Sequence, residues 1–366
     1  MAMPPGTPIA GCGIRSCRLP PMPDIASSPL PTFSLDRLRA LLADIGPDVE
    51  PAGVLRALVR AGCDRLPLPG HGETLTRWRA LAAVAAVDLS LAKCFEGHTD
   101  ALAILAELRG PAAPAGSIWG VWCAEPPRQR LTLTPAADGG VMLQGSKAWC
   151  SGANGASHAI VSGWTPAGAP WLAAVALAQP GVTLLPGGWA APAMRGSGTA
   201  SVAFDQVRAL PVGAPGAYVD RPGFLHGGAG VAACWYGGLT RIFQRLQAGA
   251  GDTPGNPFRL AHLGAADVAL GQARWALHAA AAAIDADPSH DCKLETARAR
   301  LAVEAAAEDI LGRAARALGA GPLCQDRAFA QAMADLPLYI RQSHAERDQA
   351  AHGAVVAGAG ESAWTL

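Results

Sequence analysis

Hydrophobic positions divide the chain into a helical region, a region of short strands and a second helical region. From about residue 33 to residue 109, apolar side chains recur every three or four positions, as they do on the buried face of an amphipathic helix. Leu35, Leu38, Leu42 and Ile45 form the first such face. We therefore expect an N-terminal helical domain over residues 32–115.

The pattern changes between residues 117 and 211. Short runs of Trp, Val, Thr and Leu are separated by segments rich in proline and glycine at 135–140, 166–170 and 186–188. The clearest strand covers 199–205, where Ala200, Val202 and Phe204 alternate with the other positions. These runs predict a small antiparallel β-barrel or sandwich as a β domain over residues 116–212.

Helical periodicity returns after Pro222. Apolar residues repeat every seven positions in a seam typical of antiparallel helices, formed by Leu263, Leu270, Leu277 and Ile284. We expect this helix to end near Asp287, a second to run from Lys293 to Leu318 and a third from about 326 to 352. The sequence thus predicts a mainly α fold with a central β domain and a C-terminal four-helix-type bundle over residues 213–366.

The first 31 residues are rich in proline and contain no continuous apolar core, so they do not resemble a secretory signal. We expect a disordered tail here, with Met22 as a candidate natural start. No apolar stretch reaches the roughly 18 residues that a membrane span needs. We therefore expect no membrane association.

Charge and cysteine content narrow the class of protein. The 366 residues include 29 basic and 29 acidic side chains, so no net positive field attracts nucleic acid. The nine cysteines are odd in number and include no Cys-x-x-Cys pair. The cysteines are therefore better interpreted as reduced thiols of a cytoplasmic protein than as disulfides.

Three short motifs resemble functional signatures, but each has a simpler explanation. Residues 228–233 match a relaxed dinucleotide-binding fingerprint, but no strand precedes them, so close helix packing explains them better. Ser90 and Lys93 match a Ser-x-x-Lys motif without its companion motifs, which favours chance. His344 and Asp348 are the nearest approach to a metal-ligand pair, and we expect no metal.

The segment 144–153 is a stronger candidate for a functional site. It reads Gln-Gly-Ser-Lys-Ala-Trp-Cys-Ser-Gly-Ala, and an extended conformation would place Trp149 and Ser151 on the same side. An indole can pack on a flat redox ring and a hydroxyl can donate to a ring nitrogen. A tryptophan in a strand is, taken alone, more often part of a core.

Three segments together resemble the acyl-CoA dehydrogenase family. Residues 118–126 resemble its strand ending in Thr-Glu-Pro, and residues 143–152 resemble its Leu-Asn-Gly-x-Lys-x-Trp-Ile-Thr-Asn. Residues 194–211 resemble its Gly-x-Arg-x-Ser turn and the strand that follows. The three occur in the family's order within a helix, strand, helix chain.

The resemblance implies a bound FAD and an oxidoreductase acting on an acyl thioester such as acyl-CoA, with CH–CH oxidation and hydride transfer to flavin N5. Trp149 would pack on the flavin and Ser151 would hydrogen-bond near N5. Cys123 and Ala124 would pass the pyrimidine edge through backbone groups, although Ala124 lacks the family's threonine hydroxyl. The resemblance also implies a flavoprotein or oxygen as electron acceptor and a homodimer or homotetramer.

The chain departs from the family at the catalytic base. Gln342 occupies the position of the usual glutamate, and an amide cannot take up the substrate proton. His344 is a candidate base, oriented by Glu346 or Asp348. Alternatively these residues pair along a helix surface, or His344 and Glu346 contact the pyrophosphate side of the FAD. The identity of the catalytic residue is therefore left open. A flavin-dependent monooxygenase or another redox enzyme on the same fold is an alternative, as is a catalytically silent flavin-binding or acyl-binding homologue.

Overall fold

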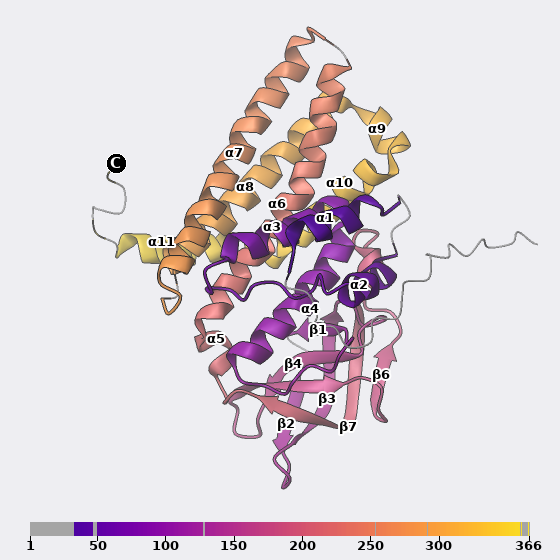
Figure 1. Ribbon diagram of the computed structural model, residues 1–366, viewed down its shortest axis with the longest axis vertical. Coiled ribbons are helices and arrows are strands. Elements are labelled where there is room, and N and C mark those ends of the chain that lie inside the picture. The colour runs from indigo at the N-terminus through magenta and orange to yellow at the C-terminus, as the bar shows by residue number, and fades with distance from the viewer. Residues whose placement is uncertain are drawn as a thin grey trace, which may run out of the picture. The chain divides into compact units, whose positions relative to one another are not determined.

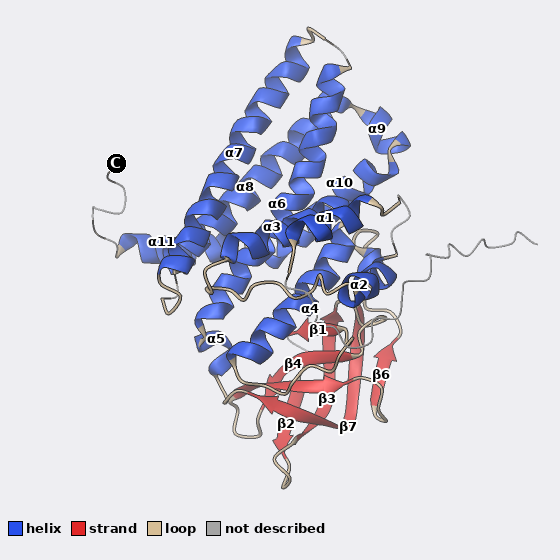
Figure 2. Cartoon of the chain, in the orientation of Figure 1, coloured by secondary structure: helices blue, strands red, loops and turns tan. Residues whose placement is uncertain are grey.

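The computed structural model describes residues 33–46, 50–126, 129–252, 254–290, 292–358, 360 and 365. The predicted tail over residues 1–31 and the candidate start Met22 lie outside the described residues. Two regions of helix flank one region of strands, and the changes of secondary structure fall close to the positions expected from the sequence (Figure 2).

Four helices form the N-terminal region: α1 (Leu35–Ala43), α2 (Pro51–Arg60), α3 (Thr74–Val87) and α4 (Leu89–Glu107) (Figure 1). Asp88 adopts an extended conformation between α3 and α4, and its Oδ1 accepts a hydrogen bond from the amide of Leu91 at 2.7 Å. This side chain ends one helix and caps the next. Most residues of α4 are buried, because the helix lies between the strands and the remaining helices.

Seven strands form a small β-barrel. They are β1 (Trp119–Trp122), β2 (Leu131–Pro135), β3 (Val141–Cys150), β4 (His158–Trp164), β5 (Pro170–Ala176), β6 (Val182–Leu185) and β7 (Ala200–Val212). The strand order is β1-β4-β2-β3-β7-β5, and the sheet closes because β4 also pairs with β5. Most pairs are antiparallel, as expected, but β4 runs parallel to β1 and β2. Val202 and Phe204 point into the barrel core, which confirms the strand predicted over 199–205.

The C-terminal region is helical. It contains α5 (Ala217–Asp220), α6 (Pro222–Gly251), α7 (Pro257–Ala286), α8 (Lys293–Leu318), α9 (Ala320–Gln325), α10 (Arg327–Tyr339) and α11 (Glu346–Ala357). The predicted bounds of α8 and the predicted end of α7 are confirmed. None of the helices in the described ranges is both long enough and apolar enough to cross a membrane.

The single helix predicted over 326–352 is wrong. After α10 the chain makes one 3-10 turn over Ile340–Gln342, and α11 begins only at Glu346. Ser343 is extended and Ala345 has a φ of 46°, so the helical path cannot continue through them. Ser343 Oγ donates to Glu304 Oε2 at 2.6 Å, a contact from another helix that periodicity within the segment does not reveal.

The two helical regions share one hydrophobic core. Trp78 of α3, Phe95 of α4 and Trp235 of α6 are all buried in it. Residues 228–233 lie inside α6, so the dinucleotide-binding alternative is excluded and helix packing accounts for their small side chains. Gly237 lies where α6 crosses α3, and a Cβ at this position would overlap the backbone of Ala82.

This crossing predicts the effect of two matched substitutions. Gly237→Ala should lower the free energy of unfolding by about 1–3 kcal/mol, because α3 and α6 must separate to admit the methyl group. Gly353→Ala, on an exposed part of α11 with nothing within 4 Å of the added Cβ, should instead raise it by up to about 1 kcal/mol. Urea unfolding followed by circular dichroism measures both. Equal effects of the two substitutions would contradict the close crossing.

Candidate functional site

A cavity of about 350 Å³ lies between α4, β1 and the turn that follows β3. Its wall combines apolar and polar groups. They include Leu55, Lys93, Val121, Ser151, Asn154 and Arg195. The volume is at the lower end of the range for pockets that bind small organic molecules.

Trp149 does not continue the extended strand. Its φ is 54°, and the pairing of β3 with β7 shifts register between Lys147 and Cys150. The expectation that Trp149 and Ser151 share one side of an extended segment is therefore wrong, because a β-bulge intervenes. The bulge leaves the Trp149 side chain 54% exposed, whereas Ser151 lines the cavity.

Two hydrogen bonds hold Ser151 in place. Its carbonyl accepts from Nε1 of Trp122 at 2.9 Å, and its Oγ accepts from Oγ1 of Thr199 at 3.3 Å. Since the Ser151 hydroxyl accepts in this pair, its own proton is left for a ligand. The bond from Trp122 also brings the end of β1 next to the bulge.

Cys123 and Ala124 follow β1 directly. Burial raises the pKa of the Cys123 thiol to about 11, and the Tyr218 hydroxyl forms a hydrogen bond with it. The next residue, Glu125, accepts hydrogen bonds from Ser162 Oγ at 2.8 Å and Trp164 Nε1 at 2.7 Å. These bonds fix the backbone of residues 123–125 beside the bulge that carries Trp149 and Ser151.

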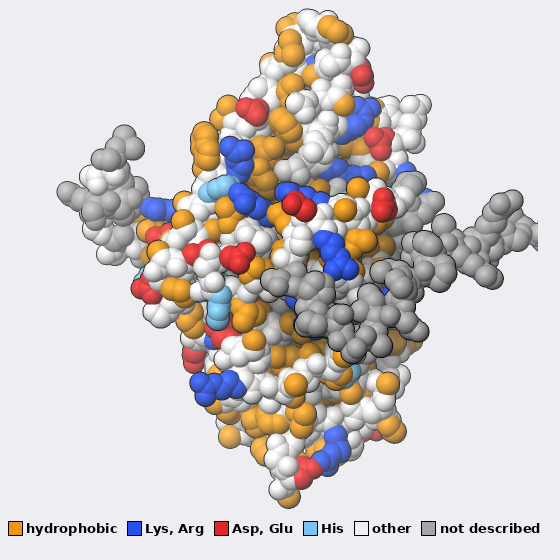
Figure 3. All heavy atoms as spheres, in the orientation of Figure 1, with side chains coloured by type: hydrophobic (Ala, Val, Ile, Leu, Met, Phe, Trp, Pro, Cys, Tyr) orange, Lys and Arg blue, Asp and Glu red, His pale blue; other side chains and the backbone are white. Residues whose placement is uncertain are grey.

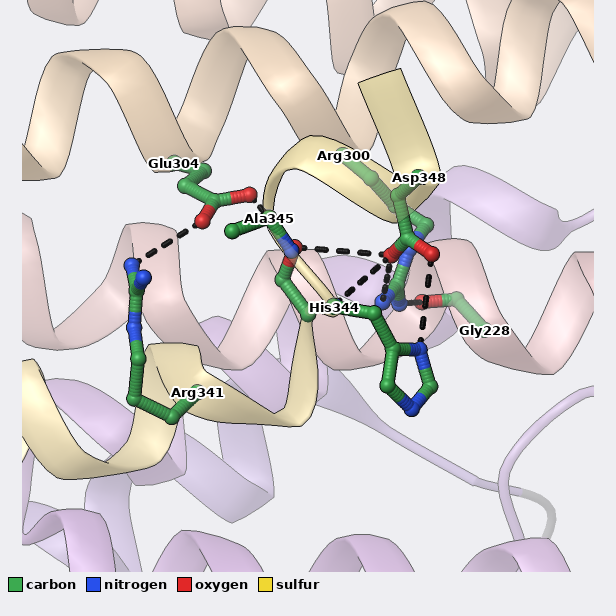
Figure 4. Close-up of polar contacts among 8 residues, drawn as sticks. Gly228, Arg300, Glu304, Arg341, His344, Ala345 and Asp348 are labelled. Carbon is green, nitrogen blue, oxygen red and sulfur yellow. Dashed lines mark hydrogen bonds and ion pairs between the residues drawn. The ribbon is translucent and has the colours of Figure 1, made fainter. Parts of the chain in front are cut away.

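His344 lies in a different cluster (Figure 4). Its Nδ1 is 3.4 Å from Oδ1 of Asp348, and its amide donates to Oδ2 of the same carboxylate at 3.1 Å. Arg300 is 3.9 Å from Asp348, and the His344 side chain is 64% exposed. The pairing of His344 with Asp348 at a helix surface, one of the two alternatives from the sequence, is therefore present.

Gln342, His344 and Glu346 do not line the cavity beside Ser151. Gln342 lies exposed in the 3-10 turn, and Glu346 lies exposed in the first turn of α11. Their suggested roles toward a cofactor or as a base stay predictions. Among the residues with described positions, no three His, Cys, Asp or Glu side chains come together as a metal site.

Sequence reasoning missed a row of charged residues on α4. Lys93, Glu96 and Asp100 lie three or four residues apart in a helix that is otherwise mostly apolar and buried. Charged residues at this spacing in an apolar helix were the sequence signal that could have identified them. Nζ of Lys93 donates to Oε2 of Glu96 at 2.8 Å, and Lys93 also lines the cavity. Burial raises the pKa of Asp100, and the neighbouring Glu96 raises it further.

The Ser-x-x-Lys match is a coincidence of spacing. Ser90 lies in the first turn of α4, because Asp88 caps the helix just before it. The ammonium group of Lys93 contacts Glu96, and the structure gives no hydrogen bond between Lys93 and Ser90.

The chain matches no protein-family model and no curated protein sequence. It does match solved structures along most of its length. Dibenzothiophene monooxygenase TdsC from Paenibacillus sp. A11-2 superposes with a TM-score of 0.74 at 19% identity, over 87% of this chain and 95% of that one. Methanesulfinate monooxygenase MsuC from Pseudomonas fluorescens superposes with a TM-score of 0.74 at 19% identity, over 88% of this chain and 96% of that one.

A third match is KijD3, solved in complex with FMN and dTDP-3-amino-2,3,6-trideoxy-4-keto-3-methyl-D-glucose. It superposes with a TM-score of 0.72 at 22% identity, over 88% of this chain and 90% of that one. TdsC has also been solved with FMN bound. Together with the helix, barrel, helix order, these likenesses confirm the acyl-CoA dehydrogenase-like fold.

Cysteine reactivity tests the cavity wall. Cys94 lines the cavity, and burial raises its pKa to about 12, as it does for Cys234. At pH 8 only about one such thiol in ten thousand is ionised, and the thiolate is the nucleophile. Among the cysteines that the structure describes, iodoacetamide should therefore modify the exposed Cys324 first and spare Cys94 and Cys234 until the protein is unfolded. Peptide mass spectrometry measures this order, and labelling of Cys94 as fast as Cys324 would contradict it.

Proposed function

We propose that this chain is a flavin-dependent oxidoreductase. The observation that carries the proposal is the meeting of the end of β1 with the bulge near the end of β3 and the turn that follows, which present an exposed indole and a hydroxyl proton beside a cavity. The FMN complexes of TdsC and KijD3 on the same fold support it.

The residues at this junction fit a flavin. Trp149 offers a flat apolar face that the barrel core does not use, and its left-handed backbone turns the indole outward. Ser151 can donate a hydrogen bond to a ring nitrogen. The backbone of Cys123 and Ala124 would pass the pyrimidine edge. The solved neighbours favour FMN over the FAD that the resemblance implies.

We favour oxygenation as the reaction. A bound reduced flavin supplies the electrons with which O2 is activated and one oxygen atom is transferred. Such a reaction needs no carboxylate at position 342, where this chain has an exposed glutamine. The apolar walls of the cavity, including Leu55, Ile118 and Val121, would exclude water from the reacting groups. TdsC and MsuC are both monooxygenases.

Dehydrogenation of an acyl thioester is the second candidate, and Asp100 favours it. Burial and the neighbouring Glu96 raise its pKa, which makes the carboxylate a stronger base than a free aspartate. The Asp100 carboxylate would then take the proton next to the thioester carbonyl, in place of the absent glutamate. An acyl-CoA would be the substrate and a flavoprotein or oxygen the electron acceptor.

We also propose that the chain forms a homo-oligomer through α7. Gly264, Val268, Gly271 and Trp275 lie on one face of this helix, and Val268 and Trp275 are exposed. Hydrophobic side chains are visible along this helix in Figure 3. Small and large residues alternate on this face, which suits packing against the same helix of a second copy.

One pair of assays separates the two reactions. Flavin-loaded protein mixed anaerobically with a panel of acyl-CoAs should keep its yellow colour. In air, with FMN reduced by NADH and a flavin reductase, it should convert a small organic substrate to a product one oxygen atom heavier. Bleaching by an acyl-CoA that is lost in Asp100→Asn would instead support the dehydrogenase. Failure to bind any flavin would contradict both enzymes and leave a protein that acts through partners.

The flavin contacts can be tested directly. Trp149→Ala and Ser151→Ala should each raise the Kd for FMN, by about tenfold for the indole and by up to about tenfold for the hydroxyl. Leu210→Ala is the matched control, because this side chain of the same sheet is 52% exposed and lies outside the cavity wall. Fluorescence titration with FMN and FAD measures both the loss and the preferred flavin. Unchanged affinity in both variants would refute these contacts.

A further inference from the structure

A second cavity, of about 510 Å³, lies next to the cavity beside Ser151. Its wall is formed by the junction of α3 and α4, by α10 and by the turn over Arg195–Ser197. The two cavities share Pro51, Arg195 and Gly196. The second cavity has polar lining residues of its own, which are Asp88, Ser90, Arg241, Arg327, Gln331 and Asp335.

Asp335 contributes a buried carboxylate to this wall. The residue is 1% exposed, and its Oδ1 accepts hydrogen bonds from the amide of Met194 at 2.5 Å and from Nε2 of Gln331 at 2.7 Å. Its Oδ2 has no hydrogen bond with the residues that the structure describes, yet water can still reach this atom. Because Asp335 lines the cavity and is covered elsewhere, Oδ2 faces the cavity.

No cation compensates this carboxylate within the described ranges. Burial raises the pKa of Asp335, the hydrogen bonds from Met194 and Gln331 lower it, and the Asp88 carboxylate raises it further. No ion pair joins Asp335 to a Lys, Arg or His side chain in these ranges. A buried charge that lacks a partner is costly, so a bound cation would stabilise this wall.

The arginines in the wall do not supply that cation. Nη1 of Arg241 donates to two carbonyls at the end of α3, at 2.8 and 2.9 Å. Burial raises the pKa of Asp88, and the Arg241 guanidinium lowers it, so Arg241 compensates this acid. Arg195 and Arg327 are exposed, and water and salt screen their charges. None of the three arginines affects the pKa of Asp335.

Ser90 is a second, independent sign of a ligand. It is 3% exposed and lines the cavity, and its hydroxyl makes no hydrogen bond with the described residues. A Cβ on Gly196, which lines the same cavity, would lie 3.3 Å from Ser90 Oγ. Buried hydroxyl groups normally have a hydrogen-bond partner, so a molecule in the cavity would satisfy this one.

We infer that this second cavity binds a small organic amine, with the ammonium group paired to Asp335 and hydrogen-bonded to Ser90. The ammonium group of a primary amine carries three N–H donors, and its charge-assisted bonds to a carboxylate are about twice as strong as neutral ones. Ile45, Ala85 and Leu89 would contact the hydrocarbon body of the amine. The site does not depend on the proposed flavin, because neither Asp335 nor Ser90 lines the first cavity.

Benzylamine and benzyl alcohol are the probes. They have nearly the same size and shape, and only the amine is charged near neutral pH, so their relative affinity isolates the ammonium group. Ligand-observed NMR titrations of the full chain at low ionic strength should show benzylamine binding about tenfold or more tightly than benzyl alcohol. Benzoate, which carries the opposite charge, should bind no better than benzyl alcohol.

Three variants locate the site. Asp335→Asn removes the charge but keeps an oxygen for the Met194 amide, and in it the two probes should bind within about twofold of each other. Ser90→Ala should weaken the binding of benzylamine about tenfold, because a hydrogen bond to a charged group is lost. Asp267→Asn is the matched control and should leave the preference unchanged, since this exposed acid of α7 lies outside both cavities.

The inference is overturned if benzylamine does not bind, if benzyl alcohol or benzoate binds equally well, or if folded Asp335→Asn keeps the preference. Ser90→Ala removes only a hydroxyl, so unchanged benzylamine affinity in this variant would overturn the site even if Asp335→Asn proves unstable. Titrations with and without FMN separate the site from the proposed function. Protein that binds no flavin but prefers benzylamine would refute the oxidoreductase and keep the amine site.

Discussion

The arrangement around the cavity depends on how β1 is held against α4. The amide of Trp119, at the start of β1, donates to Nδ1 of His98 at 3.1 Å, and Nε2 of the same ring lies 3.2 Å from Oδ2 of Asp64. Because Nδ1 accepts, the ring proton sits on Nε2 and is donated to the carboxylate. At the other end of β1, Trp122 is bonded to Ser151. One short strand therefore sets the position of α4, which carries Lys93, relative to the turn that carries Ser151.

Two of the three lysines in the chain lie close to this site; Lys147 is buried and the Lys93 side chain is 17% exposed. Lys147 donates to Ser162 Oγ at 3.0 Å and lies 3.6 Å from Glu125, which fixes the segment after β1. Lys93 pairs with Glu96 on α4. Burying an ion pair costs desolvation energy that the pair does not always recover, so such pairs are weak explanations for stability alone.

The sequence predicted the long-range order of the fold well. Helices such as α8 repeat their apolar residues over many turns, and the strand over 199–205 alternates, so local periodicity was enough. The errors occurred where a residue distant in the sequence determines the backbone conformation. Glu304 binds Ser343 and helps to break the last predicted helix, and the bulge at Trp149 arises from pairing with β7. The candidate flavin contacts come from the resemblance and stay predictions, whereas the pair of Lys93 and Glu96 was missed because charges in a helix usually mark its solvated face.

The central claim is that a flavin binds where β1 meets the bulge near the end of β3. The most direct measurement is a crystal structure of the protein grown with FMN. The account predicts isoalloxazine density against the Trp149 indole, with the Ser151 hydroxyl at hydrogen-bond distance from a ring nitrogen. Flavin bound elsewhere on the chain, with Trp149 and Ser151 making no contact to it, would contradict the account.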